Sequence, residues 1–296
     1  MQKLISLILV LFLHSVVQAQ NSTTQSLPFR YEELTAPDFV KAVKKSEGVC
    51  LLPIGILEKH GPHLPLGTDI LGCRQVSTQA AEKEYCVVFP MYYFGQINEA
   101  RHQPGTIAYS NEIIWNLLQE TCNELSRNGF KKIIIVNGHG GNIDFLHYFC
   151  MSQLHSVKDY SLVLFQVSED STMMKKIKSM RKTTEGGHAD EVETATILSI
   201  RPDLVKMDLA ATQSGANQER LEGIPFQYTG IWWYARYPNH YAGDGSKSTV
   251  ELGKTVLAFR ADQLVKLIQT VKKSNKIEEL QNQFYKEAAD PLKTKQ

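Results

Sequence analysis

The sequence lacks a charge excess of either sign. Its 296 residues carry 32 Lys and Arg against 31 Asp and Glu, which leaves a formal net charge of +1 at pH 7. Binding to nucleic acid or to an anionic membrane surface relies on a clearly basic surface. This balance gives no electrostatic support for either partner, so we expect neither nucleic acid nor membrane as a partner and a small molecule as the substrate.

Several organising features are also missing. No stretch rich in Pro, Gly or Ser divides the chain, and it has no internal repeat or low-complexity tract, so one domain is expected. The five cysteines form no C-x-x-C pair and no zinc-ribbon spacing. There is no G-x-S-x-G elbow and no Cys beside a recognisable His motif, which argues against a serine or cysteine hydrolase.

Long apolar runs are scarce outside the N-terminus. Residues 1–19 contain one Lys, an apolar core over residues 4–13 and small residues before Gln20, the pattern of a cleaved secretory signal peptide. The core is shorter than the roughly 20 residues that span a bilayer. We therefore expect a secreted or periplasmic protein with a mobile segment at 20–29, a catalytic domain at 30–271 and a charged C-terminal helix or tail at 272–296.

Apolar, β-branched runs alternate with amphipathic stretches along the chain. Strand-like runs lie at 50–57, 86–89, 132–136 and 161–167. Helical stretches include 111–126, 144–154 and 250–271. This alternation predicts an α/β fold, a single-domain three-layer α/β/α sandwich with a mostly parallel sheet.

The first strand-like run leads into LEKHGPHLPLGTD, residues 57–69. Glu58 and His60 fall where a buried strand is expected to end, and residues two apart in extended chain point to the same side. The loop that follows is long enough to bring Asp69 back to them. The segment predicts one half of a metal site; the alternative is an ordinary solvated loop.

A second polar turn, NGHGGN at residues 137–142, follows another strand and precedes a helix. Ligands of open α/β sheets bind beyond the carboxyl ends of the strands, which is where His139 would lie. The alternative is a phosphate cradle at a helix N-terminus. The Lys and the Ser or Thr of a P-loop are absent, however.

A third segment, EGGHADEVETATIL at residues 185–198, begins with a glycine pair and becomes helix-like. The helix dipole favours acids in a first turn, which accounts for some of these carboxylates but not for the His beside the glycines. Together the three segments supply Glu, His, Asp, His and Glu. Oxygen and imidazole donors of this kind suit Zn, Mn or Fe(II).

These motifs, in this order, resemble the creatininase (creatinine amidohydrolase) family. They are Glu-x-His-Gly-x-His-Leu-Pro-x-x-Thr-Asp, Asn-Gly-His-Gly-Gly-Asn and His-Ala-x-Glu-x-Glu-Thr. Weaker agreement comes from Gln103-Pro104-Gly105-Thr106 and from the Gly-Asp turn of residues 241–246. The resemblance spans roughly residues 30–267.

The resemblance implies a metal-dependent hydrolase of cyclic or linear amides, with two divalent ions per chain and a ring-like homo-oligomer, a hexamer. Zinc is the expected metal, with manganese or iron as alternatives. His188 would move protons near the substrate, and Glu193 would be a catalytic residue as well as a ligand, with Glu191 as the alternative ligand. The implied metal ligands are Glu58, His60, Asp69 (bridging both ions), His139 and Glu193.

The chain also departs from creatinine-cleaving members of that family. They carry Tyr-Glu where this chain has Gly140-Gly141. They also have tryptophans in the region that corresponds to Asn142 to His188, where this chain has none. Asp190 adds a carboxylate near the site. The expected reaction is therefore opening of a C–N bond in a larger polar amide or lactam. The alternatives are C–C cleavage of a cyclic keto-sugar of the diketo-inositol type and a non-catalytic ligand-binding homologue.

One aromatic cluster fits two roles. Tyr and Trp residues gather over residues 228–241. Packing in the core or in an oligomer interface is the first expectation, because aromatic residues dominate both. A lid over the substrate is the alternative.

Overall fold

The computed structural model describes residues 26–168, 171–225 and 227–295. Its centre is a four-stranded parallel sheet in the order β2-β1-β3-β4. β1 pairs along its whole length with β3, so the carboxyl ends of these two strands lie side by side. The strands are β1 (Val49–Ile54), β2 (Val87–Val88), β3 (Lys132–Asn137) and β4 (Ser161–Leu164).

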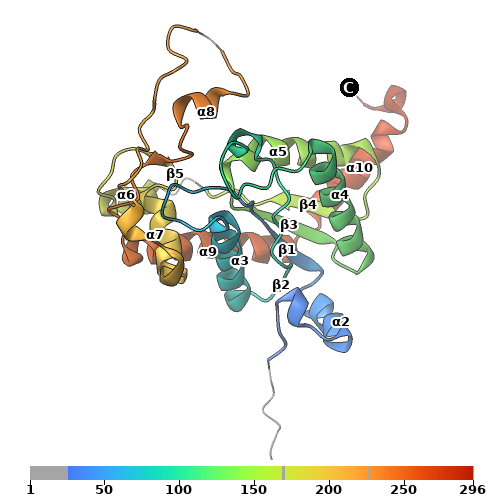
Figure 1. Ribbon diagram of the computed structural model, residues 1–296. Coiled ribbons are helices and arrows are strands. Elements are labelled where there is room, and N and C mark those ends of the chain that lie inside the picture. The colour runs from blue at the N-terminus through green and yellow to red at the C-terminus, as the bar shows by residue number, and fades with distance from the viewer. Residues whose placement is uncertain (1–25, 169–170, 226, 296) are drawn as a thin grey trace, which may run out of the picture.

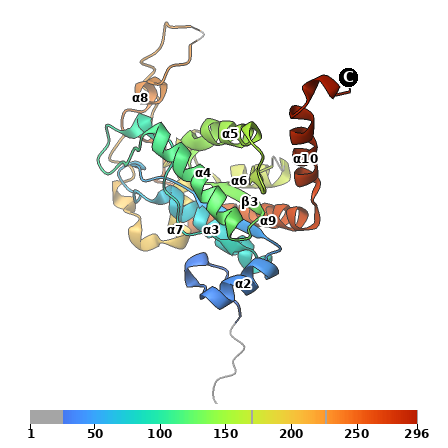
Figure 2. The same ribbon diagram turned by 90° about the vertical axis from the view of Figure 1, so that its right-hand side faces the viewer.

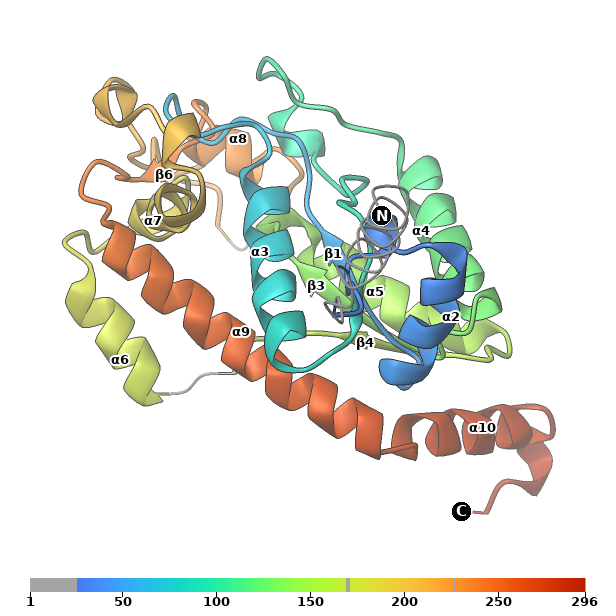
Figure 3. The same cartoon turned by 90° about the horizontal axis from the view of Figure 1, so that it is seen from below.

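Helices cover both faces of the sheet (Figure 1). α3 and α9 pack on one face, and α4 and α5 pack on the other. Figure 3 shows the long α9 crossing beneath α3 before the chain enters α10. The helices are α2 (Ala36–Lys45), α3 (Thr68–Lys83), α4 (Asn111–Arg127), α5 (Ile143–Ser152), α6 (Ser171–Met180), α7 (Glu191–Ile200), α8 (Trp232–Arg236), α9 (Val250–Lys273) and α10 (Lys276–Ala288).

Successive side chains of the central strands build two hydrophobic cores. Leu52 of β1 packs with Leu118 and Phe149 on one face, whereas Leu51 packs with Leu264 on the other. Strands buried on both faces need apolar residues at every position, which is why β1 and β3 read as continuous apolar runs. All five cysteines lie in the described part of the chain and are free thiols.

A smaller antiparallel sheet lies beside the main one. It pairs β5 (Gly186–His188) with β6 (Ala242–Gly243), and α7 follows β5 after a short turn. Between α7 and β6 the chain makes a long excursion that carries α8 and projects from the body (Figures 1 and 2). This second sheet joins residues 186–188 to residues 242–243, and His188 of β5 contacts Lys59, in the segment that follows β1.

The predicted α/β/α sandwich with a mostly parallel sheet is confirmed. Three strands are shorter than expected: β1 ends at Ile54, β2 spans only Val87–Val88 and β4 ends at Leu164. The expected signal peptide, residues 1–19, lies outside the described residues. Within the expected mobile segment, the backbone carbonyl of Phe29 accepts a hydrogen bond from Val88, so this part is packed against β2. None of the described helices has the length and apolar character needed to cross a membrane.

Candidate metal centre

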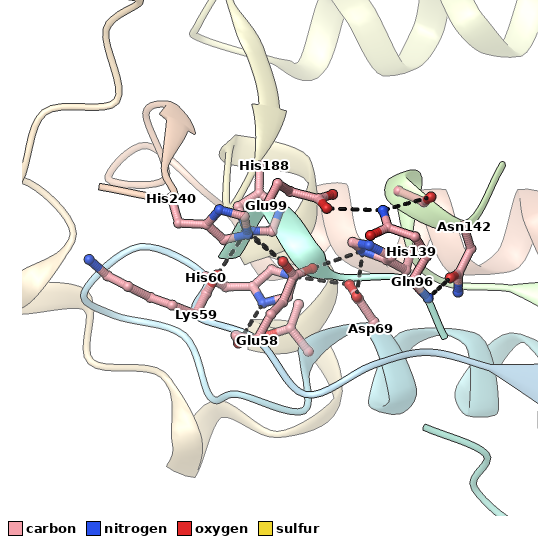
Figure 4. Close-up of polar contacts among 12 residues, drawn as sticks. Glu58, Lys59, His60, Asp69, Gln96, Glu99, His139, Asn142, His188 and His240 are labelled. Carbon is pink, nitrogen blue, oxygen red and sulfur yellow. Dashed lines mark hydrogen bonds and ion pairs between the residues drawn. The ribbon is translucent and has the colours of Figure 1, made fainter. Parts of the chain in front are cut away.

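The site lies beyond the carboxyl ends of β1 and β3. After β1 the chain runs through Glu58 and His60, folds over in a loop and enters α3 with Asp69 in its first turn. After β3 it turns through His139 into the short helix η3 (Gly140–Asn142). Figure 4 shows that these four side chains converge, as the sequence predicted.

Two glycines seat α3 directly on the strand ends. A Cβ at Gly55 would lie 2.6 Å from the backbone nitrogen of Ile70. A Cβ at Gly138 would lie 2.4 Å from the backbone oxygen of Asp69. Only glycine allows so close an approach of backbone to backbone. The first turn of α3 can therefore present the Asp69 carboxylate to the residues that follow β1 and β3.

Glu58, Asp69 and His139 meet at ion-pair distances without a well-aligned hydrogen bond. Nδ1 of His139 lies 2.8 Å from Oε1 of Glu58 and 3.1 Å from Oδ2 of Asp69. Both oxygens are nevertheless buried without a hydrogen-bond partner. Buried carboxylate oxygens left in this state are costly. A divalent cation shared by the three side chains would satisfy them, so the donor set fits a metal ion.

His60 offers a second nitrogen to the same space. Its Nδ1 donates to the backbone oxygen of Glu58 at 3.3 Å, so Nε2 is the nitrogen that an ion could use. In the metal-free chain Nε2 donates a hydrogen bond to Asp69. Nε2 lies 2.9 Å from Oδ1 of Asp69 and 4.0 Å from Oε2 of Glu193. Asp69 therefore faces His139 with one oxygen and His60 with the other, the arrangement that a bridging carboxylate requires.

His188 comes from β5, in the smaller sheet. Its Nε2 donates to the backbone oxygen of Lys59 at 2.9 Å. Nδ1 is then the nitrogen that can take or give a proton, and it lies 3.9 Å from Oε2 of Glu193. The ring is tilted by 31° relative to that of His60 with 4.2 Å between centroids, which places it against the ligand cluster.

The two candidate glutamates of α7 point in different directions. Glu193 faces the cavity, where its Oε2 accepts a hydrogen bond from the backbone N–H of Ala189. The Glu191 carboxylate instead accepts hydrogen bonds from the backbone N–H groups of Lys182 and Thr183 at 2.8–2.9 Å. Glu193, not Glu191, is therefore the carboxylate available to an ion.

Asp190 lies close to the site, as the sequence predicts, and its charge adds to burial in raising the pKa of Glu193, but its side chain is engaged at the start of α7. It is the N-cap of α7, and its side chain accepts hydrogen bonds from the backbone N–H groups of Val192 and Glu193 at 2.9 and 3.0 Å. Its other oxygen faces Arg181 at 3.7 Å. Asp190 thus fixes the start of the helix that carries Glu193.

The ligand cluster borders a cavity of about 290 Å³. Two residues of the aromatic cluster, Trp232 and Trp233 of α8, form part of its wall. The Trp233 ring stands perpendicular to that of His188 with 5.8 Å between centroids. For these two residues the structure favours the alternative role at the substrate site over core packing.

Two further residues of the cavity belong to none of the motifs. His240 is buried between α8 and β6, and its Nε2 contacts Oε2 of Glu58. Glu99, in the short helix η2 (Asn98–Ala100), lines the cavity and accepts a hydrogen bond from Gln96. No sequence motif contains either residue. Glu99 lies shortly before residues 103–106 and His240 shortly before residues 241–246, the two segments that agree weakly with the creatininase family.

The clustered charges shift several pKa values in the metal-free chain. Burial lowers the pKa of His60, but the neighbouring carboxylates, Asp69 first, outweigh it and raise the pKa to about 9. Glu58 and Asp69 likewise outweigh burial at His139 and raise its pKa. Burial raises the pKa of Glu58, but His139 and His188 outweigh it and hold that pKa well below its usual range. Burial lowers the pKa of His188 to about 3.

Metal uptake should therefore release protons. His60, with a pKa of about 9 in the metal-free chain, is protonated at pH 7.5 and must lose that proton to bind an ion. Apparent affinity should rise with pH up to about 9, by roughly tenfold per unit for each proton displaced. Zinc titration calorimetry in buffers of different ionisation enthalpy would count the protons. A binding heat that is independent of the buffer would contradict this assignment.

Comparison with known proteins identifies the family. The creatininase family model, described as creatinine amidohydrolase, matches residues 32–268. This chain belongs to the creatininase family. Creatinine amidohydrolase of Pseudomonas putida is 25% identical over 190 residues, which cover 60% of this chain and 73% of that protein. The 3-dehydro-scyllo-inosose hydrolase of Thermotoga maritima is 23% identical over 269 residues, which cover 81% and 83%.

Solved creatininase structures share the fold of this chain. A manganese form superposes with a TM-score of 0.69 at 21% identity and covers 82% of this chain and 98% of that one. A variant creatininase of Zn–Zn type gives a TM-score of 0.70 at 21% identity, with coverages of 82% and 97%. The resemblance to the creatininase family that the motifs indicated is thus confirmed.

Proposed function

We propose that this chain is a metal-dependent hydrolase that opens the C–N bond of an amide or lactam. One observation carries the proposal: Oε1 of Glu58 and Oδ2 of Asp69 are buried without a hydrogen-bond partner, at 2.8 and 3.1 Å from Nδ1 of His139. Carboxylate and imidazole groups gathered in this way suit zinc or manganese. Creatininases solved in a manganese form and in a Zn–Zn form support the same choice of metals.

The residues divide between two ion positions. Glu58 and His139 would hold one ion, His60 and Glu193 would hold the other, and Asp69 would be shared. The oxygens of Asp69 support this division, because they lie 3.1 Å from His139 and 2.9 Å from His60. When bound, such a pair supplies a nucleophile from water at neutral pH and polarises the carbonyl that is attacked.

His188 would manage the proton of this reaction. Its Nε2–H is engaged by the backbone oxygen of Lys59, so Nδ1 is the atom that exchanges protons in the cavity. Its ring is neutral in the metal-free chain, because burial lowers its pKa, so Nδ1 has a lone pair that would accept the proton of the attacking water. It would then pass that proton to the departing nitrogen. Glu193, 3.9 Å away, would stabilise the ring while it is charged.

The substrate should be larger than creatinine. A second cavity of about 730 Å³ adjoins the metal cavity, and four residues line both: Glu99, Gly140, Gly141 and Trp232. A Cβ at Gly140 would meet nothing within 4 Å, so the turn leaves this side open. The outer cavity also has polar walls, including Arg101. A substrate with a polar body beyond its reacting carbonyl would fill both spaces.

A cyclic keto-sugar is the second candidate substrate. The alignment with the Thermotoga maritima 3-dehydro-scyllo-inosose hydrolase covers 81% of this chain, against 60% for the Pseudomonas putida enzyme. The polar walls of the outer cavity suit a hydroxylated ring. Assaying both substrate classes with one preparation would choose between them.

Metal analysis tests the central proposal. Purified protein should carry about two divalent ions per chain, and a chelator should remove both the ions and the activity. Elemental analysis before and after dialysis against the chelator gives the count, and added zinc or manganese should restore turnover. A metal-free preparation that still turns over substrate would sink the proposal.

Creatinine itself should be a poor substrate. The turn is open at Gly140, although Gly141 is packed against His139 and Glu99. The open side at Gly140 does not close the metal cavity around a small flat ring, although Trp232 and Trp233 supply aromatic surface on another side. We expect kcat/KM for creatinine to fall below ~10⁴ M⁻¹s⁻¹, under the ordinary enzyme range. The metal-loaded enzyme should be assayed, with Pseudomonas putida creatinine amidohydrolase as the positive control. A value above that threshold would contradict the assignment of a larger substrate.

We also propose export and self-association. Export rests on residues 1–19 of the sequence, and the homo-oligomer, a hexamer, rests on the family resemblance. Exposed apolar side chains on α5 and α10, among them Tyr148, Met151 and Leu280, offer a surface through which two copies of the chain could contact each other. N-terminal sequencing of the mature protein and its mass by light scattering address the two points.

A further inference from the structure

His240 is held in an unfavourable backbone conformation. Its φ of +51° lies in the left-handed region, and its side chain is buried. Residues other than glycine enter this region at a cost and stay there when their surroundings hold them, often at functional sites. Glycine would fit this backbone without strain. The imidazole must therefore make contacts that offset the strain.

The hydrogen bonds of His240 fix its tautomer. Nε1 of Trp233 lies 2.9 Å from Nδ1 of His240. The indole N–H can only donate, so Nδ1 must accept and carries no hydrogen. The hydrogen of the neutral ring is then on Nε2, which contacts Oε2 of Glu58. The chain of donors runs from Trp233 through His240 to the Glu58 carboxylate.

This order of donors excludes His240 as a metal ligand and makes it a hydrogen-bond donor to Glu58. Ligand atoms of Glu58, His188 and His240 lie within 4.8 Å of one another, as a third ion position would require. Nε2 of His240 carries the hydrogen, however, so it has no lone pair for a metal. Its bond occupies Oε2 of Glu58 and leaves Oε1 facing His139, at 2.8 Å. Figure 4 shows this arrangement around Glu58.

We propose that His240, supported by Trp233, is a positioning residue that sets which oxygen of Glu58 faces the metal. The inference rests on the proposed metal-dependent function. It also connects the excursion that carries α8 to the ligand cluster, because Trp233 of α8 both lines the cavity and holds His240. Partners of this kind orient a ligand before the ion arrives, and their loss commonly weakens metal binding ~10–100-fold.

Three variants test the proposal through zinc affinity of the full chain, measured by competition with a chromogenic chelator. His240→Gly suits the backbone but removes the donor, and should weaken zinc binding ~10–100-fold. His240→Gln keeps an N–H near the position of Nε2 and should recover most of the affinity. Trp233→Phe removes the support for the tautomer and should give a smaller loss.

Glu219→Gly is the matched control, because Glu219 is an exposed residue of the same excursion with an equal φ of +51°. It should leave zinc affinity unchanged. Thermal unfolding of the metal-free variants checks that each is folded; if His240→Gly does not fold, His240→Gln and Trp233→Phe still decide.

Two outcomes overturn the proposal while leaving the metal centre intact. In one, His240→Gly binds zinc as tightly as the wild type. In the other, His240→Gln is as weak as His240→Gly, so the N–H is not responsible. A wild-type protein that binds no zinc would overturn the proposed function and this inference together.

Discussion

Replacing Asp69 with alanine should remove both ions and reduce turnover at least ~1,000-fold. Its two oxygens face different histidines, at 2.9 Å from Nε2 of His60 and 3.1 Å from Nδ1 of His139. Loss of a shared ligand therefore affects both positions, and with them the activation of water and of the carbonyl. His60→Ala and His139→Ala should each weaken mainly one ion.

Elemental analysis of the purified variants measures this directly. Asp38→Ala is a suitable control, because Asp38 is also an acid in the first turn of a helix and lies in α2. It tests the general effect of removing such a charge from a helix N-terminus. Full metal retention in Asp69→Ala would show that Asp69 does not bridge the ions.

His188→Ala should keep its metal but turn over at least ~100-fold more slowly, the usual range for loss of a general acid or base. The reason is that Nδ1 of His188 is free for proton exchange while Nε2 donates to Lys59. Metal content and kcat should be measured on the same preparation. His147→Ala, an exposed histidine on α5, controls for removal of an imidazole.

The opposite result has a structural interpretation. Nitrogen atoms of His60 and His188 and an oxygen of Glu193 lie within 4.8 Å of one another, close enough to share an ion. Metal loss in His188→Ala would therefore assign His188 as a ligand. The proton role would then pass to another group of the cavity.

The parallel sheet and the three motif segments could be predicted from local patterns. The apolar runs that became β1 and β3 are long enough to indicate strands, and polar residues follow each run directly. In a parallel sheet these ends meet at one edge. The sequence therefore predicts that Glu58 and His139 lie close together.

The remaining contacts depend on packing that has no local pattern. The choice between Glu191 and Glu193 depends on the loop at Lys182 and Thr183, whose N–H groups engage Glu191. His240 reaches Glu58 across 182 residues of sequence. The sequence predicts that Asp190 is close to the site, but its position before α7, which makes it a helix cap, follows only from the structure.

The sequence separation of Glu58 and His240 also has a consequence for folding and unfolding rates. The contact between Glu58 and His240 closes a loop of 182 residues, and because the entropy cost of closing such a loop precedes the gain from the contact, we expect the contact to form late in folding. The cluster is complete only when the early and late parts of the chain have come together. An ion that binds there would recognise the assembled protein and not its fragments. Bound metal would then act as a tie between distant parts of the chain, slowing unfolding more than it speeds folding.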